Sequence, residues 1–109
     1  MPLFIVTGSY TSTAMKGMIA NPSDRESATK SIVEASGGKM ISYYLTTGDN
    51  DFLMIVEGVN GSDLIAPLIV AGASGTVSNL KTVQAYTSAE FTAAQKKAGE
   101  IATRFKPAG

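Results

Sequence analysis

Hydrophobic and polar residues follow two periods along this chain, one typical of strands and one typical of helices. Their β-branched and aromatic content predicts four strands: residues 3–10, 39–47, 52–57 and 77–86. The second and third strands are joined by residues 48–51, Gly-Asp-Asn-Asp, which suit a tight hairpin turn. In the fourth strand the alternation is broken between Leu80 and Val83, which predicts a bulge.

Helical segments are predicted between the first two strands. Residues 11–20 favour a short helical turn that ends before a proline. A longer helix is then expected, with Asn21 as the N-cap, Pro22 at the first helical position and Asp24 in the first turn. This helix is expected to run to about Ser36 and to end at the two glycines that follow.

Two more helices are predicted in the second half of the chain. Ser62 or Asp63 can cap a helix that ends at residues 72–75, with some irregularity near Pro67. Residues 87–90, Thr-Ser-Ala-Glu, form a capping box that opens a C-terminal helix of about residues 88–105. Its apolar stripe consists of Phe91, Ala94, Ala98, Ile101 and Phe105. If this stripe is packed, replacing Phe91 or Phe105 by alanine destabilises the protein.

The order of these elements predicts the fold class. It reads β, α, β, β, α, β and then an additional helix, which is typical of an α+β, ferredoxin-like βαββαβ domain with a four-stranded antiparallel sheet. Both main helices are then expected on a single face of that sheet. The length of 109 residues suits one hydrophobic core, so we expect a single domain over residues 1–109.

The apolar composition predicts self-association. Hydrophobic residues make up 44% of the chain and charged residues 17%, below the roughly 25% charge usual in soluble domains. The first three strands carry apolar residues on both faces: Leu3 and Ile5 against Phe4 and Val6, Met40 and Tyr44 against Ile41 and Tyr43, and Phe52, Met54 and Val56 against Leu53 and Ile55. We therefore expect at least a dimer, formed through the sheet face that the first two helices leave uncovered. The alternative is that the narrow C-terminal helix covers this face.

Charge and residue usage exclude several kinds of function. Nine basic residues balance nine acidic ones without like-charge runs, so neither nucleic acid nor a membrane surface is an expected partner. The chain has neither Cys nor His, which removes thiol and Ser-His-Asp catalysis and the usual zinc and haem ligands. We therefore predict no cofactor and no metal. Because residues 1–9 lack a basic leader, a cytoplasmic location is expected.

Two polar segments have structural explanations that outweigh a functional one. Asp49, Asn50 and Asp51 offer oxygen ligands to a hard cation, but they lack the glycine and the distal glutamate of a calcium loop and suit a turn. Residues 8–13 are rich in hydroxyls next to a predicted helix start, yet they lack the P-loop ending and are explained by local capping.

Tyrosine and arginine side chains are the best candidates for ligand binding. Tyr10, Tyr43 and Tyr44 lie on predicted strands, where a polar-tipped ring can orient a ligand or pack in the core. Tyr43 and Tyr44 are adjacent and must point to opposite faces. Arg25, near the start of the first long helix, can bind a carboxylate or simply be solvated. No catalytic residue can be assigned from the sequence.

Short motifs along most of the chain resemble the GYD domain family. They comprise Met1-Pro2-Leu3-Phe4-Ile5-Val6 with Gly8 and Tyr10-Thr11, Asn21-Pro22-Ser23-Asp24-Arg25, Gly37-Gly38-Lys39, Tyr43-Tyr44, Gly48 with Asp51-Phe52, Val56-Glu57, and Glu90-Phe91. The chain departs from the family at Asn50, where the aromatic residue of the Gly-Tyr-Asp motif is expected, so no role of that tyrosine is carried over. The resemblance implies a ferredoxin-like fold related to dimeric α/β-barrel proteins, and it implies no particular activity.

Three functional hypotheses remain open at this point. The first is a non-enzymatic oligomeric module that binds a small apolar or aromatic ligand between sheet and helices. The second is a cofactor-independent isomerase or monooxygenase of the dimeric α/β-barrel type, whose acid or base must be Tyr, Asp, Glu, Lys or Arg with a shifted pKa. The third is a metabolite-sensing trimer, which the absence of a phosphate-binding motif disfavours. The discriminating observation is whether a cavity of about 300 Å³ or more contains a buried carboxylate or tyrosine next to an opening, whereas a sealed cavity favours the structural module.

Overall fold

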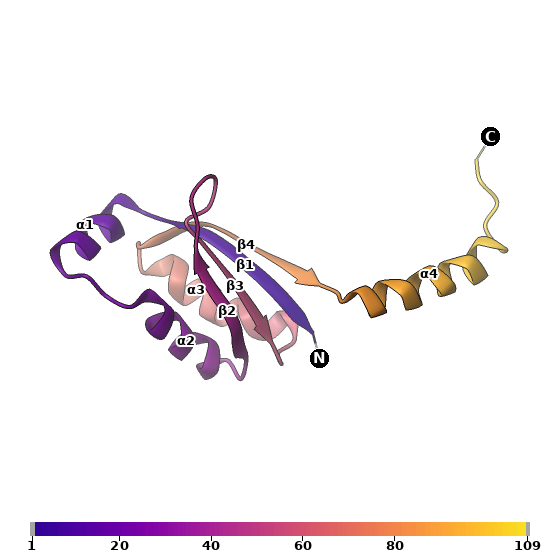
Figure 1. Cartoon of the computed structure of the whole chain (residues 1–109), viewed down its shortest axis with the longest axis horizontal. Helices are drawn as coiled ribbons and strands as arrows, with labels where there is room; N and C mark the ends of the chain where they lie inside the picture. The colour runs from indigo at the N-terminus through magenta and orange to yellow at the C-terminus, as the bar shows by residue number, and fades with distance from the viewer. Residues whose placement is uncertain (1, 109) are drawn as a thin grey trace.

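One antiparallel sheet, with strand order β2-β3-β1-β4, organises the computed structural model, which describes residues 2–108. Its strands are β1 (Leu3–Tyr10), β2 (Lys39–Leu45), β3 (Phe52–Glu57) and β4 (Val77–Ala85). The helices are α1 (Ser12–Ala20), α2 (Arg25–Ala35), the 3₁₀ turn η1 (Gly61–Leu64), α3 (Ile65–Ala73) and α4 (Ser88–Ala102). The predicted α+β, ferredoxin-like fold is confirmed (Figure 1).

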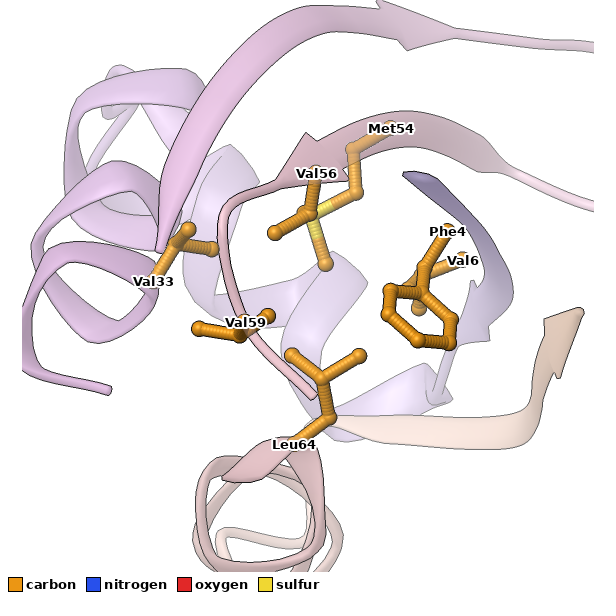
Figure 2. Close-up of a cluster of buried hydrophobic side chains, with 7 residues drawn as sticks. All are labelled: Phe4, Val6, Val33, Met54, Val56, Val59 and Leu64. Atoms are coloured by element: carbon orange, nitrogen blue, oxygen red, sulfur yellow. The ribbon is translucent and has the colours of Figure 1, made fainter. Parts of the chain in front are cut away.

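The core lies between one face of the sheet and helices α2 and α3. It consists of the buried side chains Phe4, Val6, Val33, Met54, Val56, Val59 and Leu64 (Figure 2). Val33 comes from α2 and Leu64 from η1, while the partly buried Leu68 of α3 packs against the same cluster. Val6 and Val56, on the two central strands, are almost completely buried, at 1% and 0% exposure. This cluster is what fixes both helices on the same face of the sheet.

Two β-bulges change which side chains share a face. Ile41 is an extra residue in β2, because Met40 pairs with Val56 while Ser42 pairs with Ile55. Met40 and Tyr43 therefore both pack against the core, and the predicted pairing of Met40 with Tyr44 is wrong. That pairing requires strict alternation along the strand, and a single inserted residue reverses it.

The second bulge lies in β4, slightly earlier than predicted. Thr7 pairs with Lys81 but Ser9 pairs with Ser78, so Gly8 faces an additional residue on β4. Asn79 takes up the change with a φ of 53°, a conformation that Asn tolerates better than most residues. The predicted position between Leu80 and Val83 is thus off by about one residue, and the irregularity itself is present.

The helix starts follow capping chemistry, in two cases at a residue other than the expected one. The α2 helix begins at Arg25, since the Asp24 carboxylate accepts from the Ser27 amide at 3.3 Å, and Pro22 therefore precedes the helix. Before α3, the Asp63 carboxylate accepts from the Asn60 amide at 3.1 Å and closes the η1 turn. The irregularity expected near Pro67 is this turn, and the regular helix begins only at Ile65.

Helix α4 extends away from the rest of the chain (Figure 1). Its capping box is confirmed, because the Thr87 amide donates to the Glu90 carboxylate at 2.9 Å and the Glu90 amide donates to the Thr87 hydroxyl at 3.1 Å. Hydrogen bonding of its carboxyl to the backbone amide of Thr87, and then to the Thr87 side chain, lowers the pKa of Glu90. The helix contains no buried residue, and the radius of gyration of 18.1 Å exceeds the roughly 13 Å expected of a compact chain this long.

The expected packing of the α4 stripe is not found within one chain. Phe91 and Ile101 are 65% and 58% exposed, and the helix ends at Ala102, before Phe105. Alanine at Phe91 or Phe105 is therefore not expected to destabilise the isolated chain, contrary to the prediction. The outer face of the sheet is likewise not covered by α4. Among residues 2–108, no helix is long and apolar enough to cross a membrane.

Candidate ligand-binding cavity

A cavity of about 200 Å³ lies between the sheet and the α2 and α3 helices. Its lining is mainly aliphatic and aromatic: Val6, Ile32, Val33, Phe52, Met54, Val56, Leu64, Pro67, Leu68, Val70, Ala71, Val77 and Leu80. Polar groups come from Tyr10, Arg25, Thr29, Tyr43, Ser74 and Thr76. The volume is below the 300 Å³ expected of a typical ligand site, but an apolar cavity of about 150 Å³ is large enough for benzene in another protein. The site therefore suits a ligand with a single ring or a short branched chain.

Two tyrosine hydroxyls meet at the edge of this cavity. The hydroxyl oxygens of Tyr10 on β1 and Tyr43 on β2 are 2.7 Å apart and share a hydrogen bond. Phe52 on β3 lies between the two rings in the sheet: its centroid is 5.4 Å from that of Tyr10, tilted by 41°, and 6.2 Å from that of Tyr43, stacked at 9°. The aromatic contacts hold the two hydroxyls in register across three strands.

The hairpin between β2 and β3 fixes the position of Tyr10. The Asp51 carboxylate accepts from the Tyr10 amide at 2.8 Å, and the Asp51 amide donates to the Gly8 carbonyl at 2.8 Å. Within the hairpin, the Thr46 hydroxyl donates to the Asn50 carbonyl at 2.6 Å. The loop is a turn, as the sequence indicated, and the Asp51 side chain in addition connects it to β1. The described residues contain no group of three or more acidic, Cys or His side chains that could hold a metal ion.

Burial and the partner hydroxyl raise the pKa of Tyr43. Desolvation is the largest cause, and the hydrogen bond to Tyr10 acts in the same direction. Thr29 and the positive charge of Arg25 act in the opposite direction without reversing the shift. Tyr43 is consequently a neutral hydroxyl at physiological pH, so it can donate or accept a hydrogen bond but does not provide a phenolate base.

Arg25 is the one charged residue among the described residues that line the cavity. It is half-buried at the first position of α2, where the capped helix start fixes its backbone. One of its guanidinium nitrogens donates to the Ser23 hydroxyl at 3.2 Å. Between residues 2 and 108, no carboxylate lies close enough to Arg25 to form an ion pair. The guanidinium is thus available to an anionic group at the cavity.

The structure brings together three of the four predicted ligand-binding residues. Tyr10, Tyr43 and Arg25 line the cavity, while Tyr44 lies on the opposite face of the sheet and is 63% exposed. Sequence reasoning missed Thr29 and Phe52. The sequence offered one indication of Phe52, since it is an aromatic residue immediately after the hairpin. Its position between the two tyrosines, however, depends on the order of strands in the sheet. The hydroxyl-rich segment after β1 caps α1, since the Thr11 hydroxyl accepts from the Ala14 amide at 3.2 Å.

The fold and the cavity together define an α+β domain of ferredoxin-like architecture with an apolar, tyrosine-edged pocket. The GYD domain family matches residues 4–94, which is most of the sequence, and the chain belongs to this family. No curated protein is significantly similar to it in sequence.

Solved structures support the fold. The chain is similar to MtbAldR, with 15% identity, a TM-score of 0.52 and coverage of 80% of this chain and 52% of that protein. It is also similar to a transcriptional regulator from Neisseria meningitidis in complex with L-Met, with 12% identity, a TM-score of 0.51 and coverage of 80% and 51%. The chain thus spans about half the length of these two proteins. At this level of identity the similarity concerns the fold alone.

Proposed function

We propose that this GYD domain is a binding module for a small apolar or aromatic ligand, held in the cavity between the sheet and helices α2 and α3. The observation that carries the proposal is an apolar cavity of about 200 Å³ with the Tyr10–Tyr43 hydroxyl pair at its edge. Apolar walls with a few convergent polar groups are the usual composition of a ligand site. The Neisseria regulator complexed with L-Met is consistent with this proposal through its fold only.

The enzymatic alternative has less support from the geometry. A cofactor-independent isomerase or monooxygenase needs a general base near the reacting atom. Tyr43 is the cavity residue with a clearly shifted pKa, and the shift is upward, which keeps its hydroxyl protonated. No Asp or Glu is among the described residues that line the cavity. Binding without chemistry therefore explains this set of side chains better.

The test is calorimetric titration with benzyl alcohol, a neutral single-ring probe that fits the volume. Saturable one-to-one binding is expected for the unmodified protein. Ala71 lines the cavity, and Ala71→Leu should fill it and abolish binding; Ala73→Leu, at the end of the same helix and outside the lining, is the matched control. Equal heats for the unmodified protein and Ala71→Leu would contradict the proposal.

We also propose that the domain associates with itself through the outer face of its sheet. Leu3, Ile5, Leu53 and Ile55 lie on this face, and the exposed Tyr44 and Val83 flank them on β2 and β4. Helices α2 and α3 pack on the other face, and α4 extends away from the sheet. Uncovered apolar surface of this extent is unusual in a monomer, and a stable interface needs roughly 800 Å² from each partner.

Sedimentation equilibrium at micromolar concentration tests this association. At least a dimer of the 11.3 kDa chain is expected, and Ile5→Lys in the centre of the face should shift it to monomer. Ser31→Lys adds the same charge on the exposed side of α2 and serves as the control. A monomeric unmodified chain would contradict the assembly and leave the ligand-binding proposal unaffected.

A further inference from the structure

The polar groups around the cavity differ in how much of their hydrogen-bonding capacity is already used. The Thr29 hydroxyl donates to the Arg25 carbonyl at 2.7 Å, and the Ser74 hydroxyl donates to the Ala71 carbonyl at 2.6 Å. A hydroxyl has one proton, so neither of these groups has another to offer. The Thr76 hydroxyl lies 2.6 Å from that of Ser74, and since the Ser74 proton is in use, Thr76 is the donor of this bond.

Two sets of donors in the described cavity lining are not fully used. In the Tyr10–Tyr43 pair one proton forms the 2.7 Å bond, and the second hydroxyl proton is left over. The Arg25 guanidinium carries five N–H groups, and Ser23 takes one of them. The charge of Arg25 acts on the pKa of Tyr43, so the two groups lie near each other. This part of the lining therefore presents a tyrosine proton and a positive charge without a carboxylate partner among residues 2–108.

On these grounds, and resting on the proposed function, we infer that the ligand is a small apolar monocarboxylate. Its carboxylate would be bound by Arg25 and the free hydroxyl of the tyrosine pair, while its ring or branched chain would lie against the aliphatic walls. Arginine and carboxylate are complementary in charge and in their planar geometry. A carboxylate bound to Arg25 also supplies the negative counter-charge that this guanidinium lacks at the edge of an apolar cavity.

The same set of polar groups in the cavity favours a simple carboxylic acid over an amino acid as the ligand. The ammonium group of an amino acid needs acceptors or a negative charge, and the described cavity lining contains neither Asp nor Glu. Its hydroxyl oxygens still have lone pairs that can accept a hydrogen bond, but none of them carries a negative charge. A zwitterion would therefore bring its ammonium into a mainly apolar environment without a counter-charge among the described lining residues, which is costly. Discrimination against an α-amino group is a direct consequence of the inferred site.

Calorimetric titration with three ligands of one shape tests the inference: phenylacetate, its neutral isostere phenylacetamide, and phenylalanine. Phenylacetate is expected to bind about tenfold or more tightly than either of the others at low salt, with a preference that declines as ionic strength rises. Arg25→Gln should reduce the affinity for phenylacetate to that for phenylacetamide. Arg104→Gln, in the exposed segment after α4, is the matched control and should leave the preference unchanged.

The outcomes separate the two proposals. If phenylacetamide binds as tightly as phenylacetate, or if Arg25→Gln retains the preference, the carboxylate assignment is wrong while the cavity remains a ligand site. Tighter binding of phenylalanine would also overturn the assignment, since it would require a negative charge near the ammonium. If none of the three ligands nor benzyl alcohol binds, the proposed function fails as well.

Discussion

Gly8 links the packing of the sheet to the tyrosine pair, and its substitution by alanine is the most informative change to the fold. A Cβ atom at this position would lie 2.6 Å from Cζ of Phe52 and 2.9 Å from Cδ2 of Leu80. Phe52 is 5% exposed and in contact with both tyrosine rings, so its ring cannot move without displacing them. Overpacking of this kind costs about 1–3 kcal/mol.

Thermal unfolding gives the measurement. A loss of about 1–3 kcal/mol corresponds to a decrease of roughly 4–24 °C in Tm, because each kcal/mol changes Tm by about 4–8 °C in a domain near 100 residues. Gly17→Ala is the matched control. Gly17 lies inside α1, and a Cβ atom added there would meet no atom within 4 Å, so the same substitution should add about 0.5–1 kcal/mol of stability.

Binding provides a second readout of Gly8→Ala. Displacement of Phe52 should separate the tyrosine hydroxyls and weaken benzyl alcohol binding, whereas Gly17→Ala should leave it unchanged. A Gly8→Ala protein as stable as the unmodified one, with the same affinity, would refute the argument. It would mean that Phe52 has room to move and does not set the geometry of the pair.

Three further predictions concern single side chains. Unfolding free energy should decline as pH rises above about 10, where unfolded Tyr43 ionises but the folded residue stays protonated, and Tyr43→Phe should lessen this decline in pH-dependent denaturation curves. In urea titrations, Asp51→Ala should lower the unfolding free energy by about 1.5–3 kcal/mol, because it removes the charged acceptor of the Tyr10 amide. Asn50→Ala removes a buried side-chain oxygen without a partner and should leave the unfolding free energy unchanged or raise it. A larger loss for Asn50→Ala than for Asp51→Ala would contradict the role of Asp51. Phe91→Ala should change the stability of the monomer by less than about 0.5 kcal/mol, and a loss above 1 kcal/mol would show that α4 packs in solution.

Much of the fold follows from local sequence signals. The four strands, the hairpin turn and the capping box at Thr87 are set by neighbouring residues, and the structure has them where the patterns indicate. The helix start at Arg25 is harder to place because Asn21 and Asp24 are both good N-caps, and the choice depends on where the chain must turn toward the sheet. The prediction that α4 packs within the chain is wrong for another reason. An amphipathic stripe indicates that a helix needs a packing partner, but it does not say which surface that partner is.

The candidate site is harder to predict because it depends on strand order and on one bulge. The prediction that Tyr43 and Tyr44 point to opposite faces is confirmed, but Ile41 decides that Tyr43 is the inner one. Tyr10 and Tyr43 are 33 residues apart, and their hydroxyls meet only because β3 lies between their strands. No local pattern carries this information. For Asp51 the sequence indicated a turn, and for Arg25 it left a carboxylate contact and simple solvation both open.

The most direct test of the central claim is a nuclear Overhauser experiment on the protein with bound phenylacetate. The account predicts contacts from the ring protons of the ligand to methyl groups of Val56 and Leu68, on opposite walls of the cavity, and to the ring of Tyr43. Contacts confined to exposed residues such as Val83 on the outer face, or the absence of any contact at saturating ligand, would contradict a binding site between the sheet and the helices.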